Sequence, residues 1–236
     1  MPDGSLVARN RGTPQGAVVS PVLANLFLHY VFDGWMRRKY PTIPFERYAD
    51  DAICHCQSDA QALELRQALE QRFAKCKLQL HSQKTKIVYC KDANRSGQYP
   101  ERAFDFLGYT FRPREAVNRK GKRFTAFIPA VSKKAAKRMR CRVRRWRLHR
   151  RSDLELADIA RQVRPVLTGW VRYYGRFYPS KLQEELRTID VYIVRWATRK
   201  YKRFQGHTMA TWDWLRSVKR RDPGLFAHWS LGPTAR

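Results

Sequence analysis

The sequence predicts an α+β fold in residues 1–111, connecting strands and linker at 112–131, and an all-helical domain at 132–236. The uneven charge is the first observation behind this division. Residues 1–110 contain 15 Lys and Arg against 11 Asp and Glu, whereas residues 111–236 contain 33 against 9. The second observation is the order of expected elements: helix, hairpin, helix and strands come first, and helices follow. Such a contrast favours two modules, of which the second binds a polyanion.

The first half shows local signals for each element. Ser20-Pro21 predicts a helix start, because Ser caps a helix and Pro suits its first position, and apolar residues then recur at helical spacing to Val31. Residues 44–56 predict a hairpin bent at residues 49–51. Ser58 opens a second helix. Two later segments, Ile87–Cys90 and Phe104–Phe111, are expected as strands, which gives an antiparallel sheet with helices.

The second half predicts a helical bundle with one cationic face. A helix is expected from Ser132 to Arg151, basic nearly all round and with few apolar anchors. The patterns Ser152-x-x-Glu155 and Ser180-x-x-Gln183 predict capping boxes, and Pro165 predicts a helix break.

The aromatic residues of this half have two interpretations. Helical spacing places Trp170 and Trp196 in the bundle core. Tyr173, Tyr174 and Tyr178 fit the core or stacking on unpaired bases, and both alternatives stay open.

Composition argues against several classes of protein. No apolar run approaches the roughly 20 residues that a membrane span needs, and residues 1–16 show no signal-peptide pattern. Five cysteines without a C-x-x-C pair favour reduced thiols in a cytosol-like compartment. His55 lies between Cys54 and Cys56, but strand alternation would point it away from both, so we do not expect a metal site there.

The acidic pair Asp50-Asp51 is the most informative feature of the sequence. Two adjacent carboxylates at a hairpin tip repel each other, and a purely structural turn more often contains Asp-Gly or Asn-Gly. Mg²⁺ would compensate their charge and bridge them to substrate phosphates. The alternative is a solvated acidic turn, which would be the better interpretation of Asp-Asp taken alone.

A second segment, Arg11-Gly12-Thr13-Pro14-Gln15-Gly16, lies upstream of the acidic pair. Together with Tyr48-Ala49-Asp50-Asp51 it resembles the fourth and fifth blocks of group II intron reverse transcriptase/maturases. Leu78–Lys86 resembles the sixth block and Phe104–Tyr109 the seventh, which holds the primer in that family. Gly169–Tyr174 is similar to the maturase-specific thumb. The resemblance implies a right-hand polymerase palm followed by an α-helical thumb.

Carried over to matching positions, the resemblance implies that Asp50 and Asp51 are catalytic residues and ligands of Mg²⁺. It places Gln15 and Gly16 beside the incoming nucleotide and Tyr48 against the primer end.

Three further positions follow from the same resemblance. Lys84 would lie near the triphosphate, where a cation offsets charge on the leaving pyrophosphate. Leu107 and Gly108 would form the primer grip. The alternatives are a solvated lysine and an ordinary strand end in the core.

The family's palm also uses a carboxylate from an earlier block. Only residues 1–11 precede the Gly-Thr-Pro-Gln-Gly segment here, and neither Asp3, Asp33 nor Asp105 is an obvious substitute. We therefore expect a C-terminal part of such an enzyme, without fingers and inactive alone.

The basic half is expected to bind RNA. Residues 132–152 contain no Asp or Glu, so this segment repels itself unless phosphate is near. The candidate RNA-binding residues are Lys133, Lys134, Lys137, Arg138, Arg142, Arg144, Arg145, Arg147 and Arg172.

The predicted function is RNA-directed DNA polymerisation with intron RNA binding and a maturase role in splicing. The expected partners are structured intron RNA, an RNA template with a DNA primer, deoxynucleoside triphosphates and an N-terminal fingers/palm chain. We expect no membrane partner and a bacterial cytoplasmic, RNA-associated location. The alternative is a non-catalytic RNA-binding maturase remnant or one subunit of a split enzyme.

Overall fold

The computed structural model describes residues 18–231, and the chain divides into two compact units between Ile87 and Val88. The predicted domain limits at 111/112 and 131/132 stay predictions. The first of them falls inside a continuous strand of the second unit.

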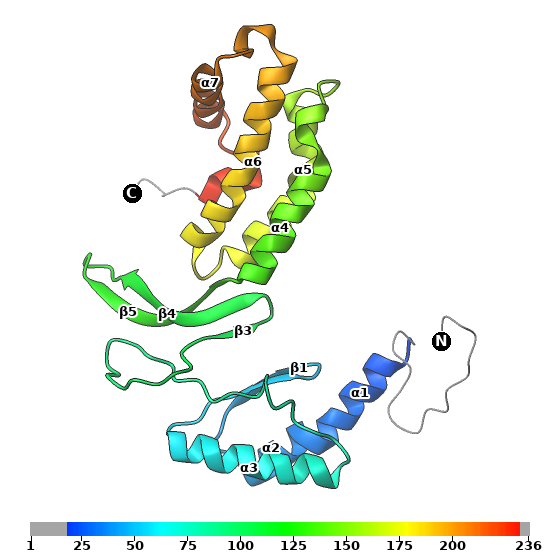
Figure 1. The fold of residues 1–236 in the computed structure, drawn as a ribbon, viewed down its shortest axis with the longest axis vertical. Coiled ribbons are helices and arrows are strands. Elements are labelled where there is room, and N and C mark those ends of the chain that lie inside the picture. The colour runs from blue at the N-terminus through cyan, green and yellow to red at the C-terminus, as the bar shows by residue number, and fades with distance from the viewer. Residues whose placement is uncertain (1–17, 232–236) are drawn as a thin grey trace. The chain divides into compact units, whose positions relative to one another are not determined.

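The first unit begins with a helical rod (Figure 1). Helix α1 (Ser20–Leu28) passes into a π-helical turn (His29–Asp33) and then into α2 (Gly34–Lys39). The helix start predicted at Ser20-Pro21 is confirmed, with Pro in the first turn, but the N-cap residue is Val19 and not Ser20. The expected apolar face is not buried along α1, where no residue is buried, and burial begins at Val31.

The predicted hairpin is confirmed, with its bend at the expected residues. Strand β1 (Phe45–Tyr48) pairs antiparallel with β2 (Asp51–Cys54), and Tyr48 lies opposite Asp51. The second predicted helix is α3 (Asp59–Lys75), whose N-cap Ser58 accepts a hydrogen bond from the Gln61 amide.

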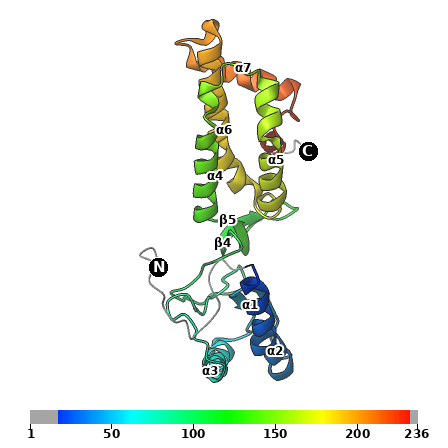
Figure 2. The same cartoon turned by 90° about the vertical axis from the view of Figure 1, so that its right-hand side faces the viewer.

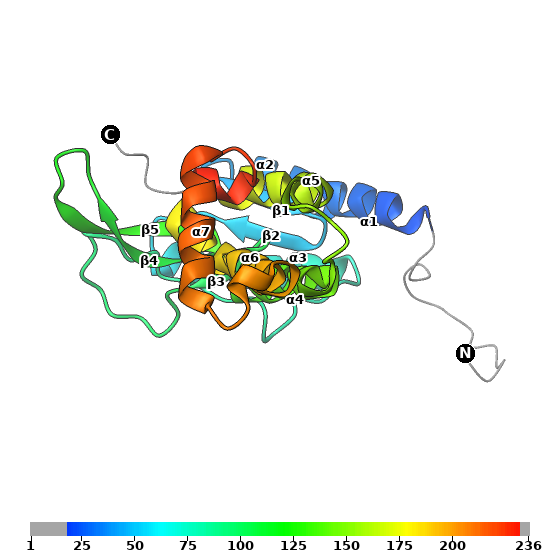
Figure 3. The ribbon, with the colours of Figure 1, turned by 90° about the horizontal axis from the view of Figure 1, so that it is seen from above.

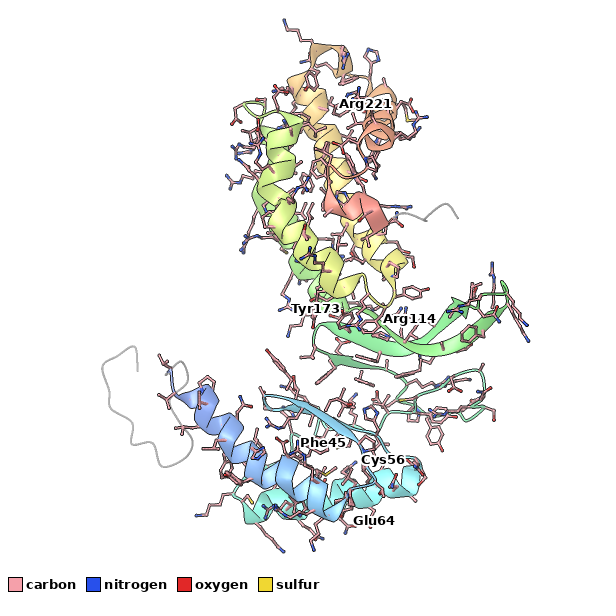
Figure 4. All side chains as sticks on the ribbon, turned by 180° about the vertical axis from the view of Figure 1, so that it is seen from behind. Phe45, Cys56, Glu64, Arg114, Tyr173 and Arg221 are labelled. Atoms are coloured by element: carbon pink, nitrogen blue, oxygen red, sulfur yellow. The ribbon has the colours of Figure 1, made fainter. Side chains whose placement is uncertain are left out.

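A small apolar core joins these elements. Its fully buried members come from α2, α3, the π-helical turn and the segment before β1: Phe32, Met36, Ile43 and Leu65. The partly buried hairpin residues Phe45, Cys54 and Cys56 pack on this cluster, and Figure 4 labels the first and the last of them.

A three-stranded antiparallel sheet begins the second unit. Its order is β3 (Phe104–Phe106), β4 (Tyr109–Val117), β5 (Arg123–Val131). The strand predicted at Ile87–Cys90 is wrong: its backbone makes isolated bonds, such as Tyr89 N–H to Glu101 O at 2.9 Å, and no ladder.

The strand predicted at Phe104–Phe111 is confirmed only in part, because strands β3 and β4 both contribute to it. The chain reverses at Leu107-Gly108, where φ is +50° and +80°, so this stretch is two strands and a tight turn.

The first bundle helix is shorter than predicted. Helix α4 (Lys133–Trp146) begins with Ser132 as N-cap, as expected, but ends at Arg147, whose φ is +50°, and a 3₁₀ turn (Leu148–Arg150) follows. It is also not basic all round, because Ala135, Ala136, Met139 and Val143 form a buried face.

The next two helices correct three local predictions. Helix α5 (Leu156–Tyr174) is capped by Glu155 and Asp158, not by Ser152, and it continues through Pro165. A buried face on both sides of Pro165, from Ile159 to Leu167, favours an unbroken helix. Helix α6 (Pro179–Lys200) begins with Pro179 and has no side-chain cap, so the Ser180-x-x-Gln183 capping box is wrong.

The bundle core lies between α4, α5 and α6, and α7 (Thr208–Arg221) crosses α6 (Figures 2 and 3). Trp196 is fully buried, as predicted, whereas Trp170 is partly buried and stacks on Trp146. The apolar positions predicted for α6 are all buried: Leu182, Leu186, Ile189, Ile193 and Trp196.

None of the helices within residues 18–231 combines the length and the apolar character required to cross a membrane.

Candidate metal site and nucleic-acid interface

The turn of the β1–β2 hairpin presents both predicted carboxylates to solvent. Asp50 lies in the turn and Asp51 begins β2, and both residues are exposed. Because Tyr48 pairs with Asp51, these two side chains lie on one face of the hairpin, opposite the face on which Phe45 and Cys54 pack. No side chain among residues 18–231 forms an ion pair or hydrogen bond with either carboxylate.

The neighbouring Arg47 binds three different groups. Its Nε and Nη2 atoms donate to the two oxygens of Asp33, each at 2.7 Å, and Nη1 donates to Asn25 Oδ1 at 2.9 Å and to the Ala49 carbonyl at 2.7 Å. Nothing in the sequence assigned a role to Arg47, since its partners lie 14 and 22 residues upstream.

The pair with Arg47 decides the role of Asp33. The hydrogen bond from Arg47 holds the pKa of the Asp33 carboxyl below its usual value, so the side chain is an anion with both oxygens engaged. Asp105 likewise accepts a hydrogen bond from the Thr110 hydroxyl. Both oxygens of Asp33 are therefore held by Arg47, so this carboxylate is not free to join Asp50 and Asp51.

The carboxylates of Asp50 and Asp51 fit a Mg²⁺ ion that also binds substrate phosphates. This ion binds one or two carboxylates and completes its coordination with water and phosphate oxygens. Asp50 and Asp51 supply two such carboxylates. Residues 18–231 contain no group of three or more His, Cys, Asp or Glu side chains placed to hold a metal.

The other residues predicted for the palm differ in their local environment. Tyr48 has 63% of its surface exposed beside Asp51, and Lys84 is exposed at the end of a turn, its amide bonded to the His81 carbonyl. Gln15 and Gly16, like Asp3, lie outside the described residues.

The predicted primer grip forms the turn between β3 and β4. The carbonyl of Leu107 accepts a hydrogen bond from the Tyr173 hydroxyl at 2.9 Å, and the Tyr109 hydroxyl donates to the Tyr173 carbonyl. A Cβ atom at Gly108 would lie 2.7 Å from the Tyr174 hydroxyl, and its φ of +80° also favours glycine. The turn is therefore held by the end of α5, where Figure 4 labels Tyr173.

Tyr173, Tyr174 and Tyr178 differ in their exposure and in their hydrogen bonds. Tyr173 is 45% exposed although its hydroxyl is bonded, so its ring remains available to a ligand. Tyr174 is partly buried against the core, and Tyr178 donates to the Glu115 carbonyl at 3.4 Å.

The cations of α4 are exposed, and almost all of them lack an acidic partner. Among residues 18–231 only Arg140 of this helix forms an ion pair, with Glu185. Two further predicted cations, Arg147 after the end of α4 and Arg172 in α5, are exposed as well. The predicted basic surface on α4 comprises Lys133, Lys134, Lys137, Arg138, Arg142, Arg144 and Arg145.

Part of this surface lines a groove between α4 and α5. Arg138, Arg142 and Arg145 lie along its α4 wall, at spacings that place them on one stripe of the helix. Trp170 and Tyr174 lie on the α5 wall. Cationic and aromatic side chains together are typical of surfaces that bind phosphates and bases.

Cys54 and Cys56 of the hairpin segment are partly buried thiols. Burial raises the pKa of the Cys54 thiol to about 12 and also raises that of Cys56, so both are protonated and unreactive near neutral pH. His55 faces away from them and bonds Glu46 at 2.5 Å, as the alternation predicted.

Two family models match separate parts of the chain. The model described as reverse transcriptase (RNA-dependent DNA polymerase) matches residues 3–111, and the model described as group II intron, maturase-specific domain matches residues 136–212. The chain belongs to the group II intron reverse transcriptase/maturase family. No curated protein matches it significantly.

The reverse transcriptase match contains the Asp50-Asp51 turn and the Leu107-Gly108 turn. The second match contains most of α4 and all of α5 and α6. The resemblance found in the sequence motifs is thus confirmed at the level of the family.

Proposed function

We propose that this protein takes part in RNA-templated DNA synthesis, with Asp50 and Asp51 as the metal-binding carboxylates of its palm. The observation that carries the proposal is an exposed hairpin turn inside the reverse transcriptase match, whose two carboxylates have no ion pair or hydrogen bond within residues 18–231. Bound there, Mg²⁺ would stabilise the charge that develops when the primer 3′ hydroxyl attacks the α-phosphate of a nucleotide.

The side chains around the turn would position the reactants. Tyr48 extends from the same hairpin face as Asp51 and would contact the primer end. Lys84 would approach the triphosphate, and the Leu107-Gly108 turn would hold the primer strand. Gln15 and Gly16 would border the nucleotide.

The second unit would bind RNA and support splicing. Its supporting feature is the basic groove of Arg138, Arg142 and Arg145, which has an aromatic wall. When these cations neutralise RNA phosphates, counterions condensed on the RNA are released, so the affinity should fall as the salt concentration rises.

A triple substitution tests the groove. Replacing Arg138, Arg142 and Arg145 by Gln should lower the slope of log affinity against log salt by about 2 to 3 units, because each lost phosphate contact is worth roughly 0.7–0.9. The measurement is filter binding of a structured intron RNA between low and moderate salt.

The matched control removes the same charge from another stripe of α4. Lys133, Lys137 and Arg144 are exposed and their spacing places them away from the groove. Their replacement by Gln should change the slope less. Equal slopes for the two triple variants would show that the groove is not the RNA surface.

A second function, RNA binding without catalysis, is favoured by one observation. The described residues supply only two carboxylates to the proposed metal site, whereas two-metal transfer needs ligands from two palm segments. We expect this 236-residue polypeptide, tested alone with Mg²⁺ or Mn²⁺, to bind RNA and not to extend a primer. Robust extension would show that a third ligand, such as Asp3, lies within it.

A further inference from the structure

We infer that Arg47 is a positioning residue that fixes the Asp50-Asp51 turn in the shape that accepts a divalent cation. The inference rests on the proposed metal-binding role of that turn. Tyr48 and Asp51 are paired, so Ala49 and Asp50 form a two-residue loop.

Ala49 occupies an unfavourable conformation in this loop. Its φ is +53°, in the left-handed region, and two-residue hairpin loops usually place Gly at such a position. For a residue with a Cβ atom the cost is about 1 kcal/mol. Neighbouring contacts must therefore stabilise the turn, and strain of this kind is common where a site is preorganised.

Arg47 supplies those contacts from the opposite face of the hairpin. Alternation places Arg47 on the inner face, with Phe45, and Asp51 on the outer face. Its Nη1 atom donates to the Ala49 carbonyl at 2.7 Å, which fixes the peptide that leads into Asp50. The inner-face side chain thus holds the backbone from which the outer-face carboxylates extend.

The guanidinium is itself held on three sides. Asp33 binds it with two parallel hydrogen bonds of 2.7 Å, a geometry that only Arg can complete, and Asn25 adds a third acceptor. Only 12% of either side chain of the Arg47–Asp33 pair is exposed, so water screens this pair weakly.

The π-helical turn explains how Asp33 reaches the hairpin. An inserted residue in the His29–Asp33 turn changes the direction of the side chains that follow, and such turns are frequent at functional sites. Asn25 lies two turns earlier on α1. The helical rod therefore presents two acceptors to one guanidinium.

The first measurement uses the metal-free chain. In the Arg47→Gln variant the amide resonances of Ala49, Asp50 and Asp51 should broaden or shift, while those of α3 stay unchanged. Arg66→Gln is the matched control, because it removes one positive charge from an exposed pair with Glu70. A turn that is as ordered in the folded Arg47→Gln variant as in the parent chain would overturn the inference.

The second measurement uses Mn²⁺ alone as the probe, through its paramagnetic broadening of the same resonances. The concentration for half-maximal broadening should rise about tenfold in Arg47→Gln, as it does when groups supporting metal ligands are removed. Arg47→Lys should restore little of it, since an ammonium cannot make the paired bonds. An unchanged Mn²⁺ response in Arg47→Gln would also overturn the inference.

Two further variants keep the outcomes separate. Asn25→Ala removes one exposed acceptor and leaves the Arg47–Asp33 ion pair, so this variant should fold even if Arg47→Gln does not. The amide resonances of the turn should shift in it as in Arg47→Gln, but by less. Asp50→Asn tests the proposed function. If this variant responds to Mn²⁺ like the parent chain, the metal assignment fails. If the Mn²⁺ response is lost in Asp50→Asn but not in Arg47→Gln, only the role of Arg47 is refuted.

Discussion

Replacing Asp50 or Asp51 by Asn is expected to abolish Mg²⁺-dependent DNA synthesis in a polypeptide that also supplies the third palm carboxylate. Each substitution removes one of the two unpaired carboxylates at the hairpin turn. A lost metal ligand removes several kcal/mol of transition-state stabilisation, which corresponds to a rate reduction of about a thousandfold or more. The measurement is primer extension on an RNA template at saturating nucleotide.

Folding should be almost unaffected by these substitutions. Both carboxylates are exposed and unpaired among the described residues, and they repel each other, so an amide in place of one relieves repulsion. Glu70→Gln is the matched control, because it removes one negative charge from a surface pair in the same unit. Full activity in both Asn variants would disprove the metal-ligand assignment.

The hairpin turn that contains Asp50 and Asp51 could be predicted from the sequence because its signals are local. Two strand-forming segments flank this turn. In the structure they pair so that Tyr48 lies opposite Asp51, with Ala49 and Asp50 between them. Helix α3 was equally clear, since Ser58 accepts the hydrogen bond that an N-cap residue should accept.

The contacts that position the turn could not be predicted in this way. Arg47 binds Asn25 and Asp33, which are distant in sequence, and a π-helical turn sets the direction of Asp33. A regular helical pattern contains no sign of an inserted residue. The sequence therefore identified the carboxylates but not the groups that fix them.

Errors in the second half have a common physical cause. Ser152 and Ser180 matched capping patterns, and Pro165 matched a helix breaker, yet packing against the bundle overrode all three. Local propensities differ by about 1–3 kcal/mol, which the burial of two apolar side chains can exceed. The buried positions of α6 were predicted correctly because their spacing reports that burial directly.

The second large effect is expected at Asp190. Among the described residues of the second unit, it is the only acidic residue that is buried. Its two oxygens accept hydrogen bonds from Lys219 at 2.9 Å, His228 at 3.0 Å and Trp229 at 2.9 Å. These donors come from α7 and from the 3₁₀ segment Ala227–Leu231. Asp190 therefore joins both segments to α6.

Replacing Asp190 by Ala should lower the free energy of unfolding by about 3–5 kcal/mol, because the substitution leaves buried donors without an acceptor. The measurement is urea or thermal unfolding of the full chain. Asp213→Ala is the matched control: its pair with Arg216 at 2.6 Å is exposed, so the loss should stay below about 1 kcal/mol. Equal losses in the two variants would contradict the role of Asp190.

The pH dependence provides a second test of the same group. Burial alone would raise the pKa of the Asp190 carboxyl, but hydrogen bonds from His228, Trp229 and Lys219 and the charge of His228 outweigh it and lower the pKa to about 2. Because this value lies below that of the unfolded chain, the ionised carboxylate stabilises the fold at pH values above about 4, and this stabilisation disappears as the pH falls through about 2. Asp190→Asn cannot ionise, so the difference in unfolding free energy between it and the parent chain should shrink from pH 4 to pH 2. A constant difference over that range would mean that the anion does not hold α7 and the terminal segment on α6.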